Sequence, residues 1–314
     1  MAIKRKDFLG LYNVKHEEIS TILETAESMK EIFTRTVKKV PTLRGKTIVN
    51  LFFEPSTRTK SSFGLAAKRL SADVMSISKK MSSVEKGESL LDTAKTMEAM
   101  GADVVVVRHG SPGAVEFLAN NLQARVLNAG DGAHAHPTQA LLDLYTIKEN
   151  LGKIKGKKVL IIGDIRHSRV ARSNIHGLNK MGAEVRVAGP ATLLPEGIEK
   201  MGVNRFTDLK KALYNVDVLN ILRIQLERQE SAFFPTINEY THFYGIHEER
   251  LQNLLDDNVL IMHPGPMNRG IEIDSMVADG RQSVITEQVT NGVAIRMALL
   301  YLLAGGEPDD EKIA

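Results

Sequence analysis

Residues 52–60 combine three hydroxyls, an arginine and the start of a helix. They read Phe-Phe-Glu-Pro-Ser-Thr-Arg-Thr-Lys and directly follow a β-rich run. Pro55 ends the strand, and the first backbone N–H groups of the helix have no partner inside it. Four side chains gather beside these N–H groups: Ser56, Thr57, Arg58 and Thr59. Such a spot suits phosphate, because a helix N-terminus is electropositive and arginine binds phosphate oxygens in bidentate fashion. A Ser-Thr pair alone would indicate an ordinary capped helix, but the whole string favours an anion site.

The string His136-Pro-Thr-Gln139 also predicts a helix start. Pro137 fits the first helical turn, and side chains three positions apart lie on one side of a helix. A buried, hydrogen-bonded histidine is the simpler interpretation of His136. A zinc site formed with His134 is disfavoured, because no further ligand follows at a suitable spacing.

Three arginines follow predicted strands. Arg108 ends the apolar run 102–107, Arg223 ends another such run, and Arg169 follows a third. Ligands of open α/β sheets bind beyond the carboxyl ends of the strands. The alternative is a solvated surface charge at each position. A dinucleotide site at residues 163–169 is weakly supported, because this segment contains a single glycine.

Two further segments have distinctive compositions. Residues 81–88 are polar and lack a helix or strand period, which predicts a loop whose composition favours simple solvation. Pro264-Gly-Pro266 follows a predicted strand and forms a rigid turn.

Two series of strands and helices must position these residues. In the first series we predict strands at 46–53, 72–78, 102–108 and 124–129. The helices between them are predicted at 59–71, 88–100 and 112–121. In the second series the strands are predicted at 157–164, 183–189, 216–223 and 258–263, with a weaker one at 203–206. The helices of that series are predicted at 169–181, 209–214 and 248–255. An amphipathic helix at 16–33 opens the chain, and an apolar helix at 286–303 closes it.

This alternation predicts an α/β fold with two parallel-sheet domains of similar size. We place the first domain at 1–150 and the second at 151–285, because residues 151–156 are short, basic and carry two glycines. The closing segment 286–314 is expected to pack back on the first domain. Two such halves suggest a cleft between them as a ligand site.

Composition narrows the function classes. The 314 residues carry 41 lysines and arginines against 38 acidic residues, a net charge of +3, which argues against a nucleic-acid coat protein. The absence of cysteine excludes disulfides, thiolate zinc sites and cysteine nucleophiles. No apolar run resembles a signal peptide or a membrane span, so we expect a soluble cytoplasmic protein that binds neither nucleic acid nor membrane.

The motifs at 52–60, 136–139 and 263–266 occur in the order found in the aspartate/ornithine carbamoyltransferase family, and the resemblance covers essentially the whole chain. It implies a carbamoyl-phosphate site built from Ser56, Thr57, Arg58, Thr59, Arg108, His136, Gln139, Pro264, Gly265 and Pro266. It also implies an aspartate site built from Ser82, Lys86, Arg169, Arg223 and Gln225. The residues with a catalytic role would be Arg58, Thr59, Lys86, Arg108 and His136.

The resemblance further implies transfer of a carbamoyl group from carbamoyl phosphate to an amine, without cofactor or metal. The ornithine branch carries a His-Cys-Leu-Pro string where this chain has His263-Pro-Gly-Pro. Two arginines also suit a dicarboxylate. We therefore expect aspartate as the acceptor, in an early step of de novo pyrimidine biosynthesis. Another amino acid such as ornithine, or a non-catalytic anion-binding homologue, remains the alternative.

The family places Ser82 and Lys86 in the active site of a neighbouring subunit, which implies a homotrimer with shared active sites. Association with regulatory chains or with dihydroorotase stays open.

Overall fold

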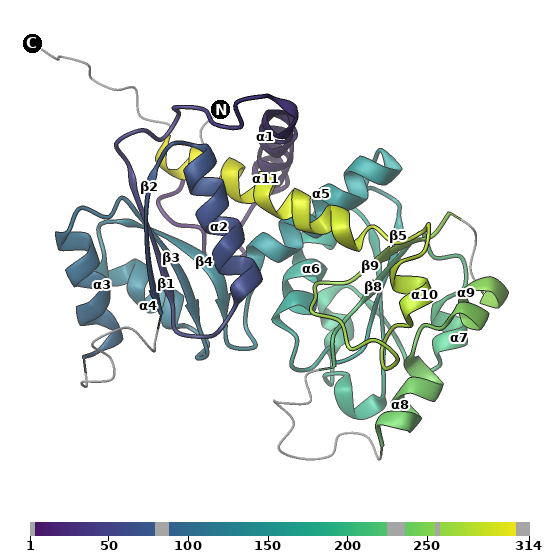
Figure 1. The fold of residues 1–314 in the computed structure, drawn as a ribbon. Helices are drawn as coiled ribbons and strands as arrows, with labels where there is room; N and C mark the ends of the chain where they lie inside the picture. Colours follow the sequence, from purple (N-terminus) through teal and green to yellow (C-terminus); the bar gives the residue numbers. More distant parts are fainter. Residues whose placement is uncertain (1–3, 79–87, 225–235, 255–257, 306–314) are drawn as a thin grey trace, which may run out of the picture. The chain divides into compact units, whose positions relative to one another are not determined.

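The computed structural model describes residues 4–78, 88–224, 236–254 and 258–305. The chain forms two compact units (Figure 1). Unit 1 contains Met1–Thr138 and Asn291–Ala314, and unit 2 contains Gln139–Thr290. Within the described ranges, none of the helices has both the length and the apolar character needed to cross a bilayer.

Unit 1 is built on a parallel four-stranded sheet in the order β2-β1-β3-β4. Its strands are β1 (Thr47–Phe52), β2 (Asp73–Ser78), β3 (Val104–His109) and β4 (Arg125–Asp131). Its helices are α1 (His16–Glu31), the short 3-10 helix η1 (Ile32–Thr34), α2 (Thr57–Arg69), α3 (Leu90–Ala99) and α4 (Ala114–Asn121). The valines of β3 are fully buried, as expected for a central parallel strand covered on both faces.

Unit 2 is built on a parallel five-stranded sheet in the order β7-β6-β5-β8-β9. Its strands are β5 (Lys158–Ile162), β6 (Glu184–Ala188), β7 (Asn204–Phe206), β8 (Val218–Ile221) and β9 (Leu260–Met262). Its helices are α6 (Arg169–Lys180), α7 (Leu209–Ala212), α8 (Ile237–Tyr244), α9 (Glu248–Leu254) and α10 (Ser275–Ala278), with the 3-10 helices η4 (Ala191–Leu193) and η5 (Ile198–Met201).

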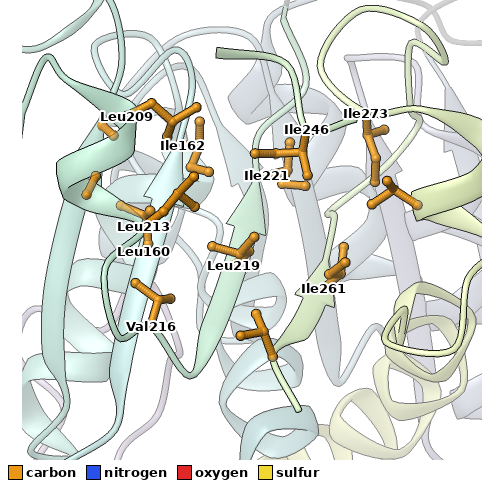
Figure 2. Packing of buried hydrophobic residues seen from close by; sticks show 14 of the residues in the cluster. Leu160, Ile162, Leu209, Leu213, Val216, Leu219, Ile221, Ile246, Ile261 and Ile273 are labelled. Carbon is orange, nitrogen blue, oxygen red and sulfur yellow. The ribbon is translucent and has the colours of Figure 1, made fainter. Parts of the chain in front are cut away.

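One face of the unit 2 sheet carries an apolar cluster (Figure 2). Leu160 and Ile162 of β5 pack there beside Leu219 and Ile221 of β8, and residues of α7 and α10 join them. Burial of this aliphatic surface stabilises unit 2 and fixes the carboxyl ends of β5 and β8.

Two helices connect the ranges of the two units. Helix α5 (Pro137–Leu151) begins at the last residues of unit 1 and continues in unit 2, and α11 (Ile285–Ala304) begins in unit 2 and ends in unit 1. From Asn291 onward α11 is grouped with unit 1, the domain to which the sequence assigned the closing segment 286–314. The compact units divide at 138/139 and 290/291, whereas the sequence placed the divisions at 150/151 and 285/286. The boundary lies at 138/139 and not at 150/151 because Asp143 of α5 accepts hydrogen bonds from side chains of α6 and β8.

The predicted α/β fold with two parallel-sheet domains is confirmed. The sequence did not predict α8 or α10. Helix α8 carries a start signal that could have revealed it, because Thr236 caps the helix by accepting from the backbone N–H of Glu239. A threonine followed three residues later by glutamate is typical of a helix N-terminus.

Candidate functional site

The predicted phosphate and carbamoyl residues of unit 1 follow three neighbouring strands. Residues 56–59 follow β1, Arg108 lies at the end of β3, and His136 follows β4. Strand β3 pairs with both β1 and β4. Because parallel strands end at the same edge of a sheet, these segments share the carboxyl edge of the unit 1 sheet. Phe52 and Arg108 are directly paired residues, and the N–H of Phe53 donates to the carbonyl of Arg108 at 2.9 Å.

The phosphate motif forms the first turn of α2. Ser56 is the N-cap residue, in an extended conformation with φ of −162°, and its hydroxyl makes no capping hydrogen bond. The carbonyl of Ser56 accepts the N–H of Lys60 at 3.1 Å, so the helix begins directly behind the motif. Thr57 and Arg58 are exposed, whereas Thr59 is buried. The arrangement leaves the backbone N–H groups of the first turn suited to an anion.

Arg108 is a buried cation at the edge of the sheet, with 9% of its surface exposed. Its Nη2 forms an ion pair with Oε1 of Glu54 at 3.0 Å, and its Nη1 donates to the carbonyl of Ala129 at 3.3 Å. Glu54 belongs to the 52–60 string, so the segment between β1 and α2 contributes one half of this pair and β3 contributes the other. The pair orients the Arg108 guanidinium beside the start of α2.

A buried aspartate shapes the turn that leads to His136. Asp131 accepts hydrogen bonds from the backbone N–H groups of Gly113 at 3.0 Å and Ala135 at 3.2 Å. It also contacts Nδ1 of His134 at 3.0 Å. His134 is thus held by Asp131 and is largely exposed, whereas His136 is buried. In the described part of the chain no group of three or more His, Cys, Asp or Glu side chains could hold a metal ion.

Gln139 is held by a buried carboxylate one turn further along α5. Its Nε2 donates to Oδ1 of Asp143 at 2.9 Å. The amide nitrogens of Gln288, Asn174 and Asn220 donate to the same carboxylate at 2.7, 2.7 and 3.2 Å. An ionised carboxylate only accepts hydrogen bonds, so the amide nitrogen of Gln139 must face Asp143. Its carbonyl oxygen is then the atom left to accept an N–H donor such as a carbamoyl NH₂ group.

Asp143 itself has an altered acidity. Burial raises the pKa of Asp143 to about 6, although the hydrogen bonds from the four amides act in the opposite direction. Desolvation disfavours the charged carboxylate, and among the residues that the structure describes no lysine, arginine or histidine forms an ion pair with it.

The predicted aspartate residues of unit 2 follow neighbouring strands in the same way. Arg169 is the first residue of α6, after β5, and Arg223 lies two residues beyond β8. Strands β5 and β8 pair along their length, and the N–H of Leu222 donates to the carbonyl of Ile162 at 2.8 Å. Arg169 is buried and Arg223 is half-buried. The structure therefore brings both arginines to the carboxyl edge of the unit 2 sheet.

Residues 264–266 follow β9, the neighbour of β8. The peptide bond between Gly265 and Pro266 is cis. The N–H of Gly265 donates to Nδ1 of His263 at 2.8 Å, and Nε2 of His263 donates to Oε1 of the buried Glu272 at 3.2 Å. The tautomer of His263 follows from these two partners, since one ring nitrogen accepts and the other donates. This pair anchors the turn at 264–266, which the family resemblance assigns to the carbamoyl-phosphate site.

Ser82, Lys86 and Gln225 lie outside the described residues. Sequence reasoning also missed residues that hold the site together: Glu54, Asp143 and Glu272. Glu54 belongs to the motif at 52–60, but the sequence analysis assigned it no role. Asp143 had a usable signal, because an acidic residue on the apolar side of a helix is seldom left buried without partners.

Each unit is an α/β unit with a parallel sheet, and arginines lie at the carboxyl edge of each sheet. This arrangement is typical of a protein that binds anionic ligands. Residues 6–149 match the family described as "Aspartate/ornithine carbamoyltransferase, carbamoyl-P binding domain", and residues 155–303 match "Aspartate/ornithine carbamoyltransferase, Asp/Orn binding domain". The chain belongs to the aspartate/ornithine carbamoyltransferase family, a family of carbamoyl-transferring enzymes.

Individual relatives agree with this assignment. The chain is 76% identical over 314 residues to an aspartate carbamoyltransferase catalytic subunit from Halothermothrix orenii, with 100% of both chains covered. It resembles the solved structure of aspartate transcarbamoylase from Trypanosoma cruzi in complex with carbamoyl phosphate and aspartate, at a TM-score of 0.86, 30% identity and coverage of 95% and 96% of the two chains. The ornithine carbamoyltransferase from Pyrococcus furiosus also gives a TM-score of 0.86, with 30% identity and coverage of 98% and 100%. The fold is therefore common to both branches, and the acceptor must be argued from the residues.

Proposed function

We propose that this chain is the catalytic chain of an aspartate carbamoyltransferase, which transfers the carbamoyl group of carbamoyl phosphate to the amine of L-aspartate. The observation that carries the proposal is the pair Arg169 and Arg223 behind adjacent strands of unit 2. Two guanidinium groups match the two carboxylates of aspartate, whereas the side-chain ammonium of ornithine would be repelled. The likeness to the Halothermothrix orenii subunit supports the same acceptor.

In the proposed reaction, the neutral amine of aspartate attacks the carbonyl carbon of carbamoyl phosphate. A C–N bond forms, the bond between that carbon and the phosphate oxygen breaks, and phosphate leaves with the bonding electron pair. The amine proton passes to the departing phosphate, so the products are N-carbamoyl-L-aspartate and inorganic phosphate. No covalent enzyme intermediate is needed, and catalysis rests on positioning and fixed positive charge.

The residues of unit 1, together with Gln139 at the start of unit 2, are assigned to carbamoyl phosphate. The hydroxyls of Ser56, Thr57 and Thr59, the Arg58 guanidinium and the N-terminus of α2 hold the phosphate. Arg108, Thr59 and His136 stabilise the oxyanion that develops on the carbonyl oxygen. The carbonyl oxygen of Gln139 accepts from the carbamoyl NH₂ group, in keeping with the orientation that Asp143 imposes.

The residues of unit 2 are assigned mainly to aspartate. Arg169 and Arg223 bind its carboxylates, and Gln225 assists them. The carbonyls of Pro264 and Gly265, in the turn closed by Pro266, accept N–H groups of both substrates.

We further propose a cytoplasmic homotrimer in which Ser82 and Lys86 complete the site of a neighbouring subunit. The support is the family resemblance of residues 81–88. A mixing experiment tests it: inactive Lys86→Ala and Arg108→Ala chains, dissociated and reassembled together, would regain about a quarter of wild-type activity from the intact composite sites. Activity that stays at the level of the separate variants would reject shared sites.

The acceptor assignment is tested with the purified wild-type chain. Carbamoyl phosphate is supplied with aspartate, with ornithine or with neither, and the carbamoylated product is quantified. We expect a carbamoylated product only in the reaction that contains both carbamoyl phosphate and aspartate. Product with ornithine would move the chain to the other branch, and phosphate binding without any product would favour a non-catalytic anion-binding homologue. A role in an early step of pyrimidine biosynthesis follows only if the product is carbamoylaspartate.

A further inference from the structure

Arg296 is a buried arginine on α11 to which sequence reasoning assigned no role. It belongs to the part of α11 that is counted with unit 1, and 4% of its surface is exposed. Its guanidinium stacks over the ring of Phe63, 5.1 Å from the ring centroid. A charge buried to this extent is costly unless it is compensated, so its presence in an apolar helix calls for a physical reason.

The hydrogen bonds of Arg296 connect the two chemical motifs of unit 1. Its Nη1 donates to the hydroxyl of Ser62 at 2.9 Å, and its Nη2 donates to the hydroxyl of Thr138 at 3.4 Å. Ser62 lies on α2, one turn after Arg58, and Thr138 lies between His136 and Gln139. One rigid guanidinium fork therefore joins the phosphate helix to the first turn of α5. Helix α11 supplies the support, since Nη1 also donates to the carbonyl of Gly292 at 2.9 Å.

The positive charge of Arg296 is not balanced by an ion pair. Its acceptors are two hydroxyls and a carbonyl, and across the described ranges no carboxylate lies within ion-pair distance of it. Burial, followed by the positive charges of Arg108 and Arg58, lowers the pKa of Arg296 to about 9. The guanidinium still remains protonated at neutral pH. A phosphate group bound at the start of α2 would offset this accumulated charge.

We propose that Arg296 is a positioning residue of the anion site, which fixes α2 against the first turn of α5 and adds to the positive potential that holds the phosphate. This inference rests on the proposed function, because it assigns the phosphate of carbamoyl phosphate to that edge of the sheet. It implies that loss of Arg296 weakens phosphate binding although Arg296 lies behind the residues that touch the ligand.

The test measures the affinity of the intact protein for inorganic phosphate by calorimetry, together with the KM values for both substrates. Arg296→Met keeps the apolar stem and removes the charge and the fork, and we expect phosphate to bind about tenfold more weakly. The KM for carbamoyl phosphate rises by a similar factor, while the KM for aspartate stays within about twofold. Arg296→Lys keeps the charge but not the fork, and a loss of about threefold is expected.

Arg69→Met is the matched control. Arg69 lies at the other end of α2, and its guanidinium also stacks on an aromatic ring, 4.0 Å from the centroid of Phe33. Its loss should lower thermal stability and leave phosphate affinity unchanged.

Unchanged phosphate affinity in Arg296→Met would overturn the inference, as would an equal loss of affinity in Arg69→Met. If Arg296→Met does not fold, the phosphate affinity of Arg296→Lys is the test. Wild-type phosphate affinity in a folded Arg296→Lys protein would then overturn the proposal. A wild-type chain that neither binds phosphate nor transfers a carbamoyl group would instead refute the proposed function.

Discussion

The carboxylate of Asp143 should make the stability of this chain depend on pH in an unusual direction. Asp143 is buried among four amide N–H donors and forms no ion pair with any described residue, and its pKa is raised from 3.8 to about 6. Between these two values the folded chain retains a proton that the unfolded chain has released. Raising the pH through this window therefore lowers the free energy of unfolding.

The pKa values set the size of the effect. One pKa unit corresponds to about 1.4 kcal/mol, so the full difference between 3.8 and about 6 is about 3 kcal/mol. Between pH 4.5 and pH 7 the part of this difference that is expressed is about 2 kcal/mol. Asp143→Asn carries no titrating group at this position, so comparison with wild type isolates the contribution of Asp143 from those of the other carboxylates.

The assay is urea unfolding of both proteins, followed by circular dichroism because the chain contains no tryptophan. The free energy of unfolding of wild type minus that of Asp143→Asn should fall by about 2 kcal/mol from pH 4.5 to pH 7. Asp279→Asn is a control of opposite sign, because the hydrogen bonds from Arg269 lower the pKa of Asp279. A difference between wild type and Asp143→Asn that is constant with pH, or that rises, would refute the reasoning.

Three further substitutions and one matched control test other parts of the account. Arg108→Ala should lower turnover by about 10²–10³-fold with an unchanged circular dichroism spectrum, and wild-type turnover would contradict its proposed role in stabilising the oxyanion. Glu272→Gln replaces a fully buried carboxylate, which accepts the N–H of His263 Nε2, by an amide and should lower the free energy of unfolding by about 2 kcal/mol in urea titrations; a change below about 1 kcal/mol would show that the charge on this acceptor is not needed. Ser168→Ala removes the cap of α6 and should cost about 1 kcal/mol while raising the KM for aspartate, because Arg169 is the first residue of that helix. Ser89→Ala removes an equivalent cap on α3 and should cost the same stability without affecting that KM; equal KM changes in both variants would argue against a local effect on Arg169.

Much of the fold could be predicted from the sequence because its signals are local. The strand β3 has four consecutive valines, a pattern typical of a parallel strand buried on both faces. The same holds for the order of strands and helices, which predicts two parallel sheets. The motif at 52–60 likewise predicts the start of α2, because Pro55 ends the strand and a hydroxyl residue is favoured at the N-cap.

The supporting residues of the site could not be predicted in the same way, because their partners lie far away in the sequence. The burial of Asp143 can be understood only from the fold, in which Asn174, Asn220 and Gln288 of three other elements donate hydrogen bonds to its carboxylate. Arg296 lies in an apolar helix, and only the fold reveals that it reaches Ser62 on α2. Neither hydrophobic period nor motif spacing contains this information.

The boundary of the first unit illustrates the same limit. A short, basic, glycine-containing segment at 151–156 suggested a junction, whereas contacts group α5 with the second unit from Gln139 onward. Composition marks where a chain can bend, and packing decides to which core a helix belongs.

The central claim is that unit 1 binds the phosphate group and unit 2 binds the carboxylates of the acceptor. Its most direct test measures phosphate affinity by calorimetry and the KM for aspartate in two variants, Arg58→Ala and Arg223→Ala. The account predicts that Arg58→Ala weakens phosphate binding at least tenfold, whereas Arg223→Ala leaves phosphate affinity at the wild-type value and raises the KM for aspartate at least tenfold. Loss of phosphate binding in Arg223→Ala, or undiminished phosphate binding in Arg58→Ala, would contradict it.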